Sequence, residues 1–198
     1  MNWHPNPVIF CPQDFTGNRE VHWIDSADTL QLLANYLSTQ TIIAVDTEGH
    51  NQQSFLGMTC FIQVSTHDKD FLVDALALYQ EIGPILGKVF SSFSTVKLFH
   101  DMIDIRSLQR DFDLFTCGAI NMQEAFHHYK PGAQKISFRE MVKELVGLEL
   151  SKEGQLADWR VRPLCRELAQ YAVNDSRLLL KGWHSLITKI SLGINIFC

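Results

Sequence analysis

The sequence predicts a single α/β domain built on a mixed β-sheet. Its 198 residues suit one domain of ordinary size or two small ones. β-rich apolar segments come first, and strands then alternate with helical patterns towards the C-terminus. No repeat, low-complexity segment or linker divides the chain. The composition, 46% hydrophobic and 20% charged, is that of a globular protein and excludes a disordered or collagen-like chain.

The N-terminal part predicts an extended arm followed by a helix. Residues 1–20 contain three prolines and are expected to form the arm, residues 21–190 the domain, and residues 191–198 a tail. Ser26 is a suitable N-cap for the first helix. The apolar residues of that helix recur at helical spacing and are Leu30, Leu33, Ala34 and Leu37.

The next segments predict three strands. The continuous apolar run at 41–45 ends in acids and is typical of a central strand buried on both faces. Residues 58–65 and 71–73 follow with tight connections. We therefore expect an antiparallel meander of these three strands.

The middle of the chain predicts alternating helices and strands. Residues 76–93 have a helical pattern with a break near the Gly-Pro pair at 83–84. Residues 96–99 predict a fourth strand, which a helix follows. A short fifth strand is expected within 114–120.

The C-terminal third predicts two helices. Ser137 and Glu140 form the S-x-x-E capping box of the first helix, and Gly147 is expected to end it. Residues 150–162 are predicted to be irregular. A long helix is expected from about residue 164 to residue 190.

Charge and cysteine content exclude several classes of protein. The net charge of −5 and the pI of about 5.9 argue against nucleic-acid binding through a broad basic surface. Five scattered cysteines without a C-x-x-C pair argue against a zinc site and a secreted disulfide framework. No apolar run reaches the roughly 18 residues of a membrane span, and the N-terminus lacks signal-peptide features. The sequence therefore predicts an intracellular protein without a membrane association.

Two acids follow the central strand. Asp46 and Glu48 are two residues apart, so their side chains point to the same side of the strand. Adjacent carboxylates repel each other, and a divalent cation such as Mg²⁺ or Mn²⁺ removes that repulsion. Taken alone, the pair is better explained as two solvated acids at the start of a loop.

Three more residues can likewise be interpreted either as part of a catalytic site or as ordinary structural residues. Asp104 opens the helix after the fourth strand, where the helix dipole by itself favours an acid. Tyr171 and Asp175 are four residues apart in the last helix and share one face, where the phenol could lie beside a metal-bound water. Alternatively, they are a half-buried tyrosine beside a solvated acid.

In their order along the chain, these motifs resemble the DEDD 3′→5′ exonucleases, in the tyrosine-bearing subgroup that includes ribonuclease D. The resemblance runs from about residue 42 to about residue 180. The nearest branch is the exosome-associated nuclear exoribonuclease, with matching strings V-D-T-E-G-H, S-F-L-G-M-T-C-F-I-Q-V-S, D-I-R-S-L-Q-R-D-F and Q-L-A-D-W-R-V-R-P-L. The resemblance implies a ribonuclease-H-like fold with a five-stranded mixed sheet flanked by helices.

The resemblance also implies a mechanism with two Mg²⁺ or Mn²⁺ ions about 4 Å apart. Asp46 would bridge both ions, Glu48 and Asp175 would hold the first, and Asp104 would support the second. Tyr171 would orient the attacking water, and the product would be a nucleoside 5′-monophosphate.

Four further positions in the matched strings are expected to bind substrate: His50, Lys152, Gln155 and Trp159. For Trp159 the alternative is that its ring packs the loop, with the neighbouring arginines paired to acids. The implied partners are the 3′ end of single-stranded RNA and an RNA-processing complex such as the exosome. No basic cluster provides a nuclear address, and the resemblance alone favours the nucleus.

Two departures from the family pattern keep other functions open. The spacer before Asp104 is one residue shorter than in relatives, and Ser107 stands where relatives carry a tryptophan that stacks on the terminal nucleotide. These departures favour a catalytically weak or silent RNA-binding module, while the retained acids favour a nuclease. A DNA-directed exonuclease is the third hypothesis. The partner-binding region and C-terminal module of exosome-type relatives do not fit in 198 residues, so we expect a part of a longer protein or a short stand-alone form.

Overall fold

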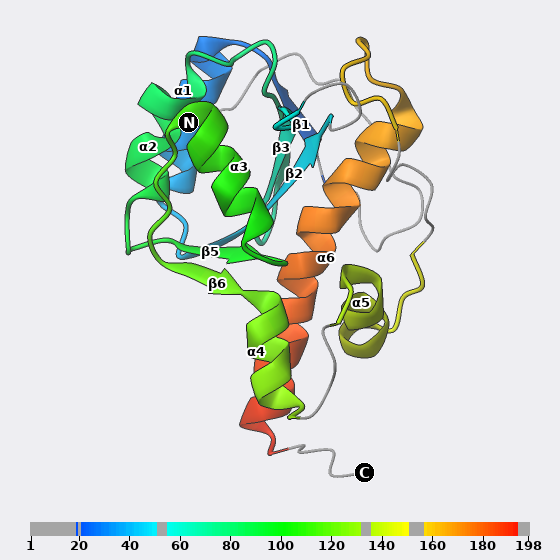
Figure 1. The fold of residues 1–198 in the computed structure, drawn as a ribbon. Helices are drawn as coiled ribbons and strands as arrows, with labels where there is room; N and C mark the ends of the chain where they lie inside the picture. The colour runs from blue at the N-terminus through cyan, green and yellow to red at the C-terminus, as the bar shows by residue number, and fades with distance from the viewer. Residues whose placement is uncertain (1–18, 20, 51–54, 132–135, 151–156, 194–198) are drawn as a thin grey trace.

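The computed structural model describes residues 19, 21–50, 55–131, 136–150 and 157–193. These residues form one mixed sheet in the order β1-β4-β3-β2-β5-β6, with helices on both faces (Figure 1). The strands are β1 (Val21–Ile24), β2 (Ile42–Gly49), β3 (Thr59–Ser65), β4 (Asp70–Asp74), β5 (Val96–Phe99) and β6 (Ala119–Asn121). The expected arm lies outside the described residues apart from Arg19, and the expected tail apart from residues 191–193.

The predicted meander is confirmed, but the predicted number of strands is wrong. Strand β3 pairs antiparallel with both β2 and β4. Strand β5 pairs in parallel with β2, and β6 pairs in parallel with β5. The sheet has six strands rather than five because β1 pairs in parallel with β4 at the edge. The sequence V-H-W-I of β1 has no regular alternation of apolar and polar residues and follows the proline-containing segment, so it did not predict a strand.

The helices are α1 (Ala27–Leu37), α2 (Ile82–Phe90), α3 (Ile103–Phe112), α4 (Met122–Tyr129), α5 (Phe138–Val146) and α6 (Arg166–Ser191). The capping box of α5 is confirmed, with Ser137 and Glu140 bonded reciprocally and Gly147 at the C-cap. Helix α4 was not predicted; the Asn121 side chain caps it. No helix in the described part of the chain is long and apolar enough to cross a membrane.

The predicted helix over 76–93 is shorter than expected. It begins only at Ile82, so the Gly-Pro pair lies in its first turn and does not interrupt it. Proline is tolerated there because the first helical N–H groups have no partner within the helix. Gly83 is required by packing, since a Cβ atom at this position would lie 2.2 Å from the Phe112 carbonyl oxygen of α3.

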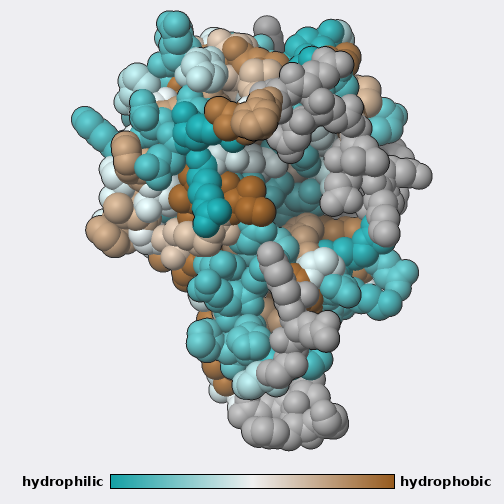
Figure 2. All heavy atoms as spheres, in the orientation of Figure 1, coloured by the Kyte–Doolittle hydropathy of each residue, from teal (hydrophilic) through white to brown (hydrophobic). Residues whose placement is uncertain are grey.

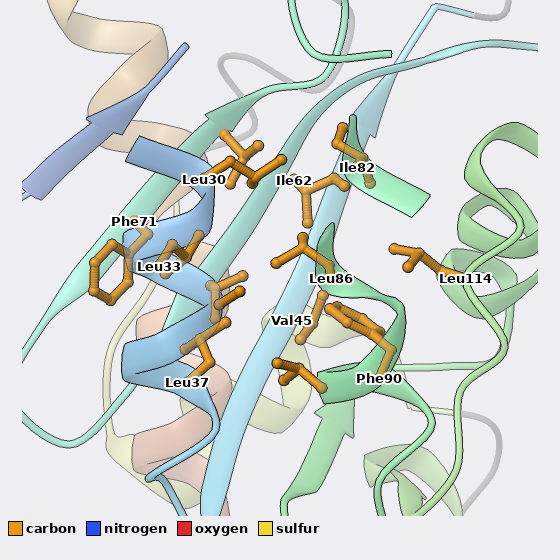
Figure 3. Close-up of a cluster of buried hydrophobic side chains, with 14 of the residues drawn as sticks. Leu30, Leu33, Leu37, Val45, Ile62, Phe71, Ile82, Leu86, Phe90 and Leu114 are labelled. Carbon is orange, nitrogen blue, oxygen red and sulfur yellow. The ribbon is translucent and has the colours of Figure 1, made fainter. Parts of the chain in front are cut away.

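The hydrophobic core fills both faces of the sheet. One face carries α1, α2 and α3, whose buried residues pack on alternate side chains of β2, β3 and β4 (Figure 3). The other face is covered by α6, with α4 and α5 against its C-terminal half. Strand β2 lies at the centre and contributes Val45 to the first face and Ala44 to the second. The end of β2 is therefore placed between α3 and α6.

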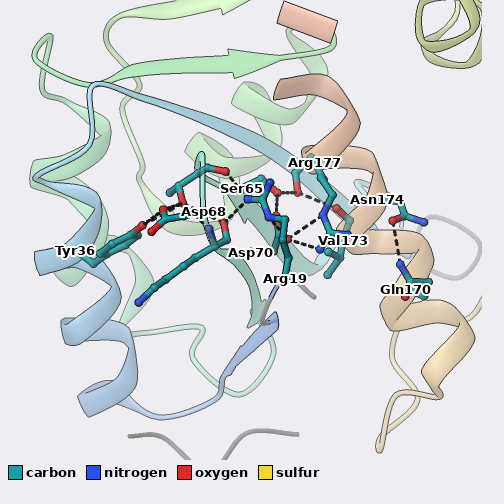
Figure 4. Close-up of polar contacts among 12 residues, drawn as sticks. Arg19, Tyr36, Ser65, Asp68, Asp70, Gln170, Val173, Asn174 and Arg177 are labelled. Atoms are coloured by element: carbon teal, nitrogen blue, oxygen red, sulfur yellow. Dashed lines mark hydrogen bonds and ion pairs between the residues drawn. The ribbon is translucent and has the colours of Figure 1, made fainter. Parts of the chain in front are cut away.

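A buried ion-pair network holds α6 against the sheet (Figure 4). The Arg177 guanidinium donates to Asp70 at the start of β4, with the Nε–Oδ2 distance 2.9 Å. Ser65 donates to the same carboxylate at 2.6 Å and contacts Ser176 at 2.8 Å. Arg177 and Asp70 are each 1% exposed, so this pairing sets the position of α6 along the sheet.

Candidate metal centre and active site

The centre of the site is a cluster of three carboxylates from two elements. Asp46 and Glu48 project from the end of β2 on the side of α6, because strand side chains alternate and Ala44 packs under that helix. Asp175 of α6 meets them there. One carboxylate oxygen from each of the three lies within 4.8 Å of the others. The two motifs, 127 residues apart in sequence, are therefore brought together by the packing of α6 on β2.

Tyr171 lies beside this cluster. It precedes Asp175 by four residues, one helical turn, and both line the same pocket. The Tyr171 ring packs against Trp159 at a centroid distance of 6.1 Å, and burial together with the charges of Asp175, Glu48 and Asp46 raises the pKa of its hydroxyl. The phenol is thus held at the edge of the acidic cluster with its hydroxyl towards the carboxylates.

Asp104 reaches the site from the other side of the sheet. It lies in the first turn of α3, as predicted, and lines the pocket. Its Oδ1 accepts a hydrogen bond of 2.5 Å from the Thr47 hydroxyl. Asp104 does not belong to the 4.8 Å cluster, so it is the outlying acid of the four.

The pKa values of the four acids and of the tyrosine are all raised above their ordinary values. Burial raises the pKa of Glu48 to about 9, and the charges of Asp175 and Asp104 add to the effect. Burial likewise raises the pKa of Asp175 to about 7 and that of Asp104 to about 6, although hydrogen bonds from Tyr171 and Thr47 act in the opposite direction. For Asp46, burial and four neighbouring acids raise the pKa well above its usual range. Burial and the carboxylates also raise the pKa of the Tyr171 hydroxyl. Without a cation, the site therefore resists full ionisation.

These residues fit a divalent cation of the Mg²⁺ or Mn²⁺ type. The donor set consists of carboxylate oxygens, which these hard cations prefer. A cation at the cluster would neutralise the repulsion that raises the carboxyl pKa values. Asp46, Glu48 and Asp175 are the residues that would hold it.

The acids line an open pocket of about 970 Å³, near the upper end of the roughly 300–1,000 Å³ typical of ligand sites. Eight of its described lining residues are Asp or Glu, and Arg139 is the one Arg or Lys among them. The outer surface on the side of α3 and α4 is mostly hydrophilic with small hydrophobic patches (Figure 2). A polyanionic ligand could enter such a pocket only with cations to offset the carboxylates.

The predicted substrate-binding residues have different outcomes. Lys152 and Gln155 lie outside the described residues. His50 is buried, 6% exposed, and does not line the pocket; its backbone N–H donates to the Met58 carbonyl oxygen at 2.9 Å. Its Nδ1 lies 3.7 Å from Asp158 Oδ1.

Trp159 is placed in the core, and the expectation that its ring contacts substrate is corrected here. The side chain is 1% exposed and packs edge-on against Phe61 and at a tilt against Tyr171. Nearby, Arg162 pairs with Asp74 at 2.5 Å and stacks over Phe61. The alternative interpretation, a loop packed by tryptophan with arginine paired to an acid, describes this segment.

The sequence did not single out several residues of the site. Gln170 and Asn174 line the pocket and bond to each other at 2.9 Å (Figure 4). Their spacing of four, next to Tyr171 and Asp175, was the signal that could have found them. Thr47 and the start of α5 lacked any such signal, because only the fold brings them to the pocket.

The acid cluster predicts an unusual pH dependence of stability. The folded-state pKa values of Glu48, Asp175 and Asp104, about 9, 7 and 6, exceed the ordinary values of 4.5 and 3.8. A group whose pKa is raised by folding stabilises the folded state most at pH values below its ordinary pKa. This stabilisation is lost as the pH rises through the raised pKa of the folded state. We therefore expect the melting temperature in EDTA to fall between pH 5 and pH 9.

The same reasoning predicts that excess Mg²⁺ raises the melting temperature more at pH 8 than at pH 5.5, because the ligands must be deprotonated to bind it. Thermal melts of Glu48→Gln in EDTA are the control and should show a flatter pH profile. A wild-type melting temperature that does not change with pH or Mg²⁺ would contradict the assignment of the site.

Comparison with known proteins places these features in a family. Residues 21–191 match the family model described as 3′-5′ exonuclease. Exosome complex exonuclease RRP6 of Saccharomyces cerevisiae is 36% identical over 170 residues, 85% of this chain and 23% of that protein. Human exosome complex component 10 is 35% identical over 177 residues, 89% of this chain and 19% of that protein. The chain thus spans about a fifth of the length of the curated relatives it matches.

Solved structures share the fold. The catalytic core of RRP6 from Trypanosoma brucei superposes with a TM-score of 0.83 at 31% identity, over 91% of this chain and 49% of that one. Escherichia coli RNase D superposes with a TM-score of 0.79 at 24% identity, over 87% of this chain and 46% of that one, which supports the fold alone.

Proposed function

The chain belongs to the 3′-5′ exonuclease family and has its ribonuclease-H-like fold, and from that premise we propose that it is a metal-dependent 3′-5′ exoribonuclease. The observation that carries this proposal is the cluster of Asp46, Glu48 and Asp175 within 4.8 Å, beside Tyr171 in an open acidic pocket. A binding module would have no need to bury like charges against each other, since that arrangement opposes folding.

The reaction proposed is hydrolysis of the terminal phosphodiester. Bound Mg²⁺ or Mn²⁺ supplies Lewis-acid chemistry, which activates the attacking water and stabilises the charge that develops on phosphate. Water oxygen forms a bond to the terminal phosphorus, the bond from phosphorus to the 3′ oxygen breaks, and that oxygen takes up a proton. The product is a 5′-mononucleotide and a chain one nucleotide shorter.

Each acid has a distinct role in this proposal. Asp46 belongs to the three-acid cluster, and the charge of Asp104 also raises its pKa, so Asp46 would help to hold both cations. Glu48 and Asp175 complete the first position. Asp104, outside the three-acid cluster, would help to hold the second cation, which would stabilise the charge that develops on the leaving oxygen.

Tyr171 is assigned to orient the attacking water. Its hydroxyl shares the pocket with Asp175 and Glu48, the two residues assigned to the first cation position, and their charges raise its pKa. The raised pKa keeps the phenol protonated at neutral pH, so that it acts as a hydrogen-bond donor or acceptor and not as a charged base. Lys152 is proposed to bind the terminal phosphate and Gln155 to support the substrate, whereas His50 is buried away from the pocket.

RNA is proposed as the substrate, rather than DNA, because the similar curated relatives are exosome components. By the same likeness we propose that the chain works with an RNA-processing complex such as the exosome and acts in the nucleus.

The function is tested with 5′-labelled single-stranded RNA in Mn²⁺ or Mg²⁺. We expect a ladder that shortens from the 3′ end, release of 5′-mononucleotides, and no cleavage in EDTA. Circular RNA of the same sequence and a matched DNA are the controls. Cleavage of the circle would contradict an exonuclease, preference for DNA would favour the DNA-directed alternative, and RNA bound but uncut would favour the silent binding module.

A further inference from the structure

The side chain between the two acids of β2 points to the opposite face of the sheet. Because strand side chains alternate, Thr47 faces α3 while Asp46 and Glu48 face α6. The Thr47 hydroxyl donates to Asp104 Oδ1 at 2.5 Å, across 57 residues of sequence. The backbone of Thr47 also interacts favourably with the Asp104 carboxylate. One residue of the central strand therefore restrains the outlying acid of the site.

The start of α3 leaves this restraint to Thr47. The N-cap of α3 is Met102, which has no side-chain acceptor, and the first turn is closed instead by Asp101, whose Oδ1 accepts from the Ile103 N–H at 2.7 Å. That bond fixes where the helix begins. Among the side-chain hydrogen bonds of the described residues, the one from the Thr47 hydroxyl is the bond that the Asp104 carboxylate accepts.

We propose that Thr47 is a positioning residue, whose hydroxyl fixes the orientation of Asp104 towards the second cation position. The proposal rests on the proposed function. Asp104 is half-buried on the pocket wall but lies outside the cluster of Asp46, Glu48 and Asp175. An unrestrained carboxylate in the first turn of a helix would be free to turn towards solvent. The Thr47 hydroxyl keeps it in place before any cation or substrate arrives, which lowers the entropic cost of binding the second ion.

The alternative is that the bond merely fastens α3 to the sheet. The chain contains an internal comparison for this alternative, because a second threonine on the sheet bonds to an aspartate of the same helix. The Thr59 hydroxyl donates to Asp111 Oδ2 at 2.7 Å, near the other end of α3. Thr59 and Asp111 do not line the pocket. If seating α3 is what matters, loss of either hydroxyl should have the same consequence.

The experiment is calorimetric titration of the chain with Mn²⁺, on wild type, Thr47→Val, Thr47→Ser and Thr59→Val. Valine keeps the β-branched shape and strand preference of threonine and removes the hydroxyl, whereas serine keeps the hydroxyl. We expect Thr47→Val to weaken one Mn²⁺-binding event by about 10–100-fold, the usual effect of losing an outer partner of a metal ligand. Thr47→Ser and Thr59→Val should bind Mn²⁺ as wild type does.

Melting temperature in EDTA is the second readout. Both valine variants should melt a few degrees lower, by about 2–4 °C for the loss of one hydrogen bond in a chain of this size. Equal Mn²⁺ affinity in Thr47→Val and wild type, or an equal loss in both valine variants, would overturn the role of Thr47 while leaving the exonuclease proposal intact. A wild-type chain that binds no Mn²⁺ would overturn the proposed function itself, and this role with it.

Discussion

Asp46→Asn is expected to abolish cleavage of RNA and at the same time to raise the stability of the metal-free chain. Asp46 is assigned to both cation positions, and a metal ion in such a site supplies several kcal/mol of transition-state stabilisation. Since each 1.36 kcal/mol is a factor of ten, we expect a loss of at least about 10³-fold in single-turnover rate. The stability should rise because Asn removes a buried carboxylate that Asp104, Asp175 and Glu48 repel.

The two effects are measured on one preparation, by single-turnover cleavage in Mn²⁺ and by thermal melting in EDTA at pH 8. Asp25→Asn is the matched control, since it makes the same change of charge at an exposed residue ahead of α1. It should leave both quantities near the wild-type values. Cleavage by Asp46→Asn within tenfold of the wild-type rate would show that the metal site lies elsewhere.

Tyr171→Phe is expected to lower the cleavage rate by about 10²–10⁴-fold, the range for a positioned partner of proton or water. The phenylalanine ring keeps the contact with Trp159 and leaves the three carboxylates in place. Binding of RNA and of Mn²⁺ should therefore change little. The free energy of unfolding should fall by only about 1 kcal/mol, the usual net value of one hydrogen bond.

Tyr36→Phe is the matched control for this change. The Tyr36 hydroxyl also donates to a carboxylate, that of Asp68 at 2.6 Å, but on α1 and outside the pocket. It should reproduce the small loss of stability without the loss of rate. If Tyr171→Phe cleaves as fast per folded molecule as Tyr36→Phe, the tyrosine is a packing residue and has no part in orienting water.

The features that depend on neighbours in sequence could be predicted from the sequence. The capping box of Ser137 and Glu140, the shared face of Asp46 and Glu48, and the helical spacing of Tyr171 and Asp175 follow from local hydrogen bonding and from the two periodicities of backbone structure. The meander of β2, β3 and β4 also followed, because short connections favour antiparallel neighbours. The resemblance to a family then joined these motifs into one expected site.

The features that depend on contacts between distant segments were decided only by the tertiary structure. Strand β1 has no regular alternation in its sequence and is defined by its parallel pairing with β4. Trp159 is buried because α6 packs over it, although its sequence also suited an exposed ring. Thr47 reaches Asp104 because the last residues of β2 lie between α3, on one face of the sheet, and α6, on the other face. Local periodicity predicts the face of the sheet to which a side chain points. Which residue it contacts 57 positions away depends on the free energy of packing the whole domain.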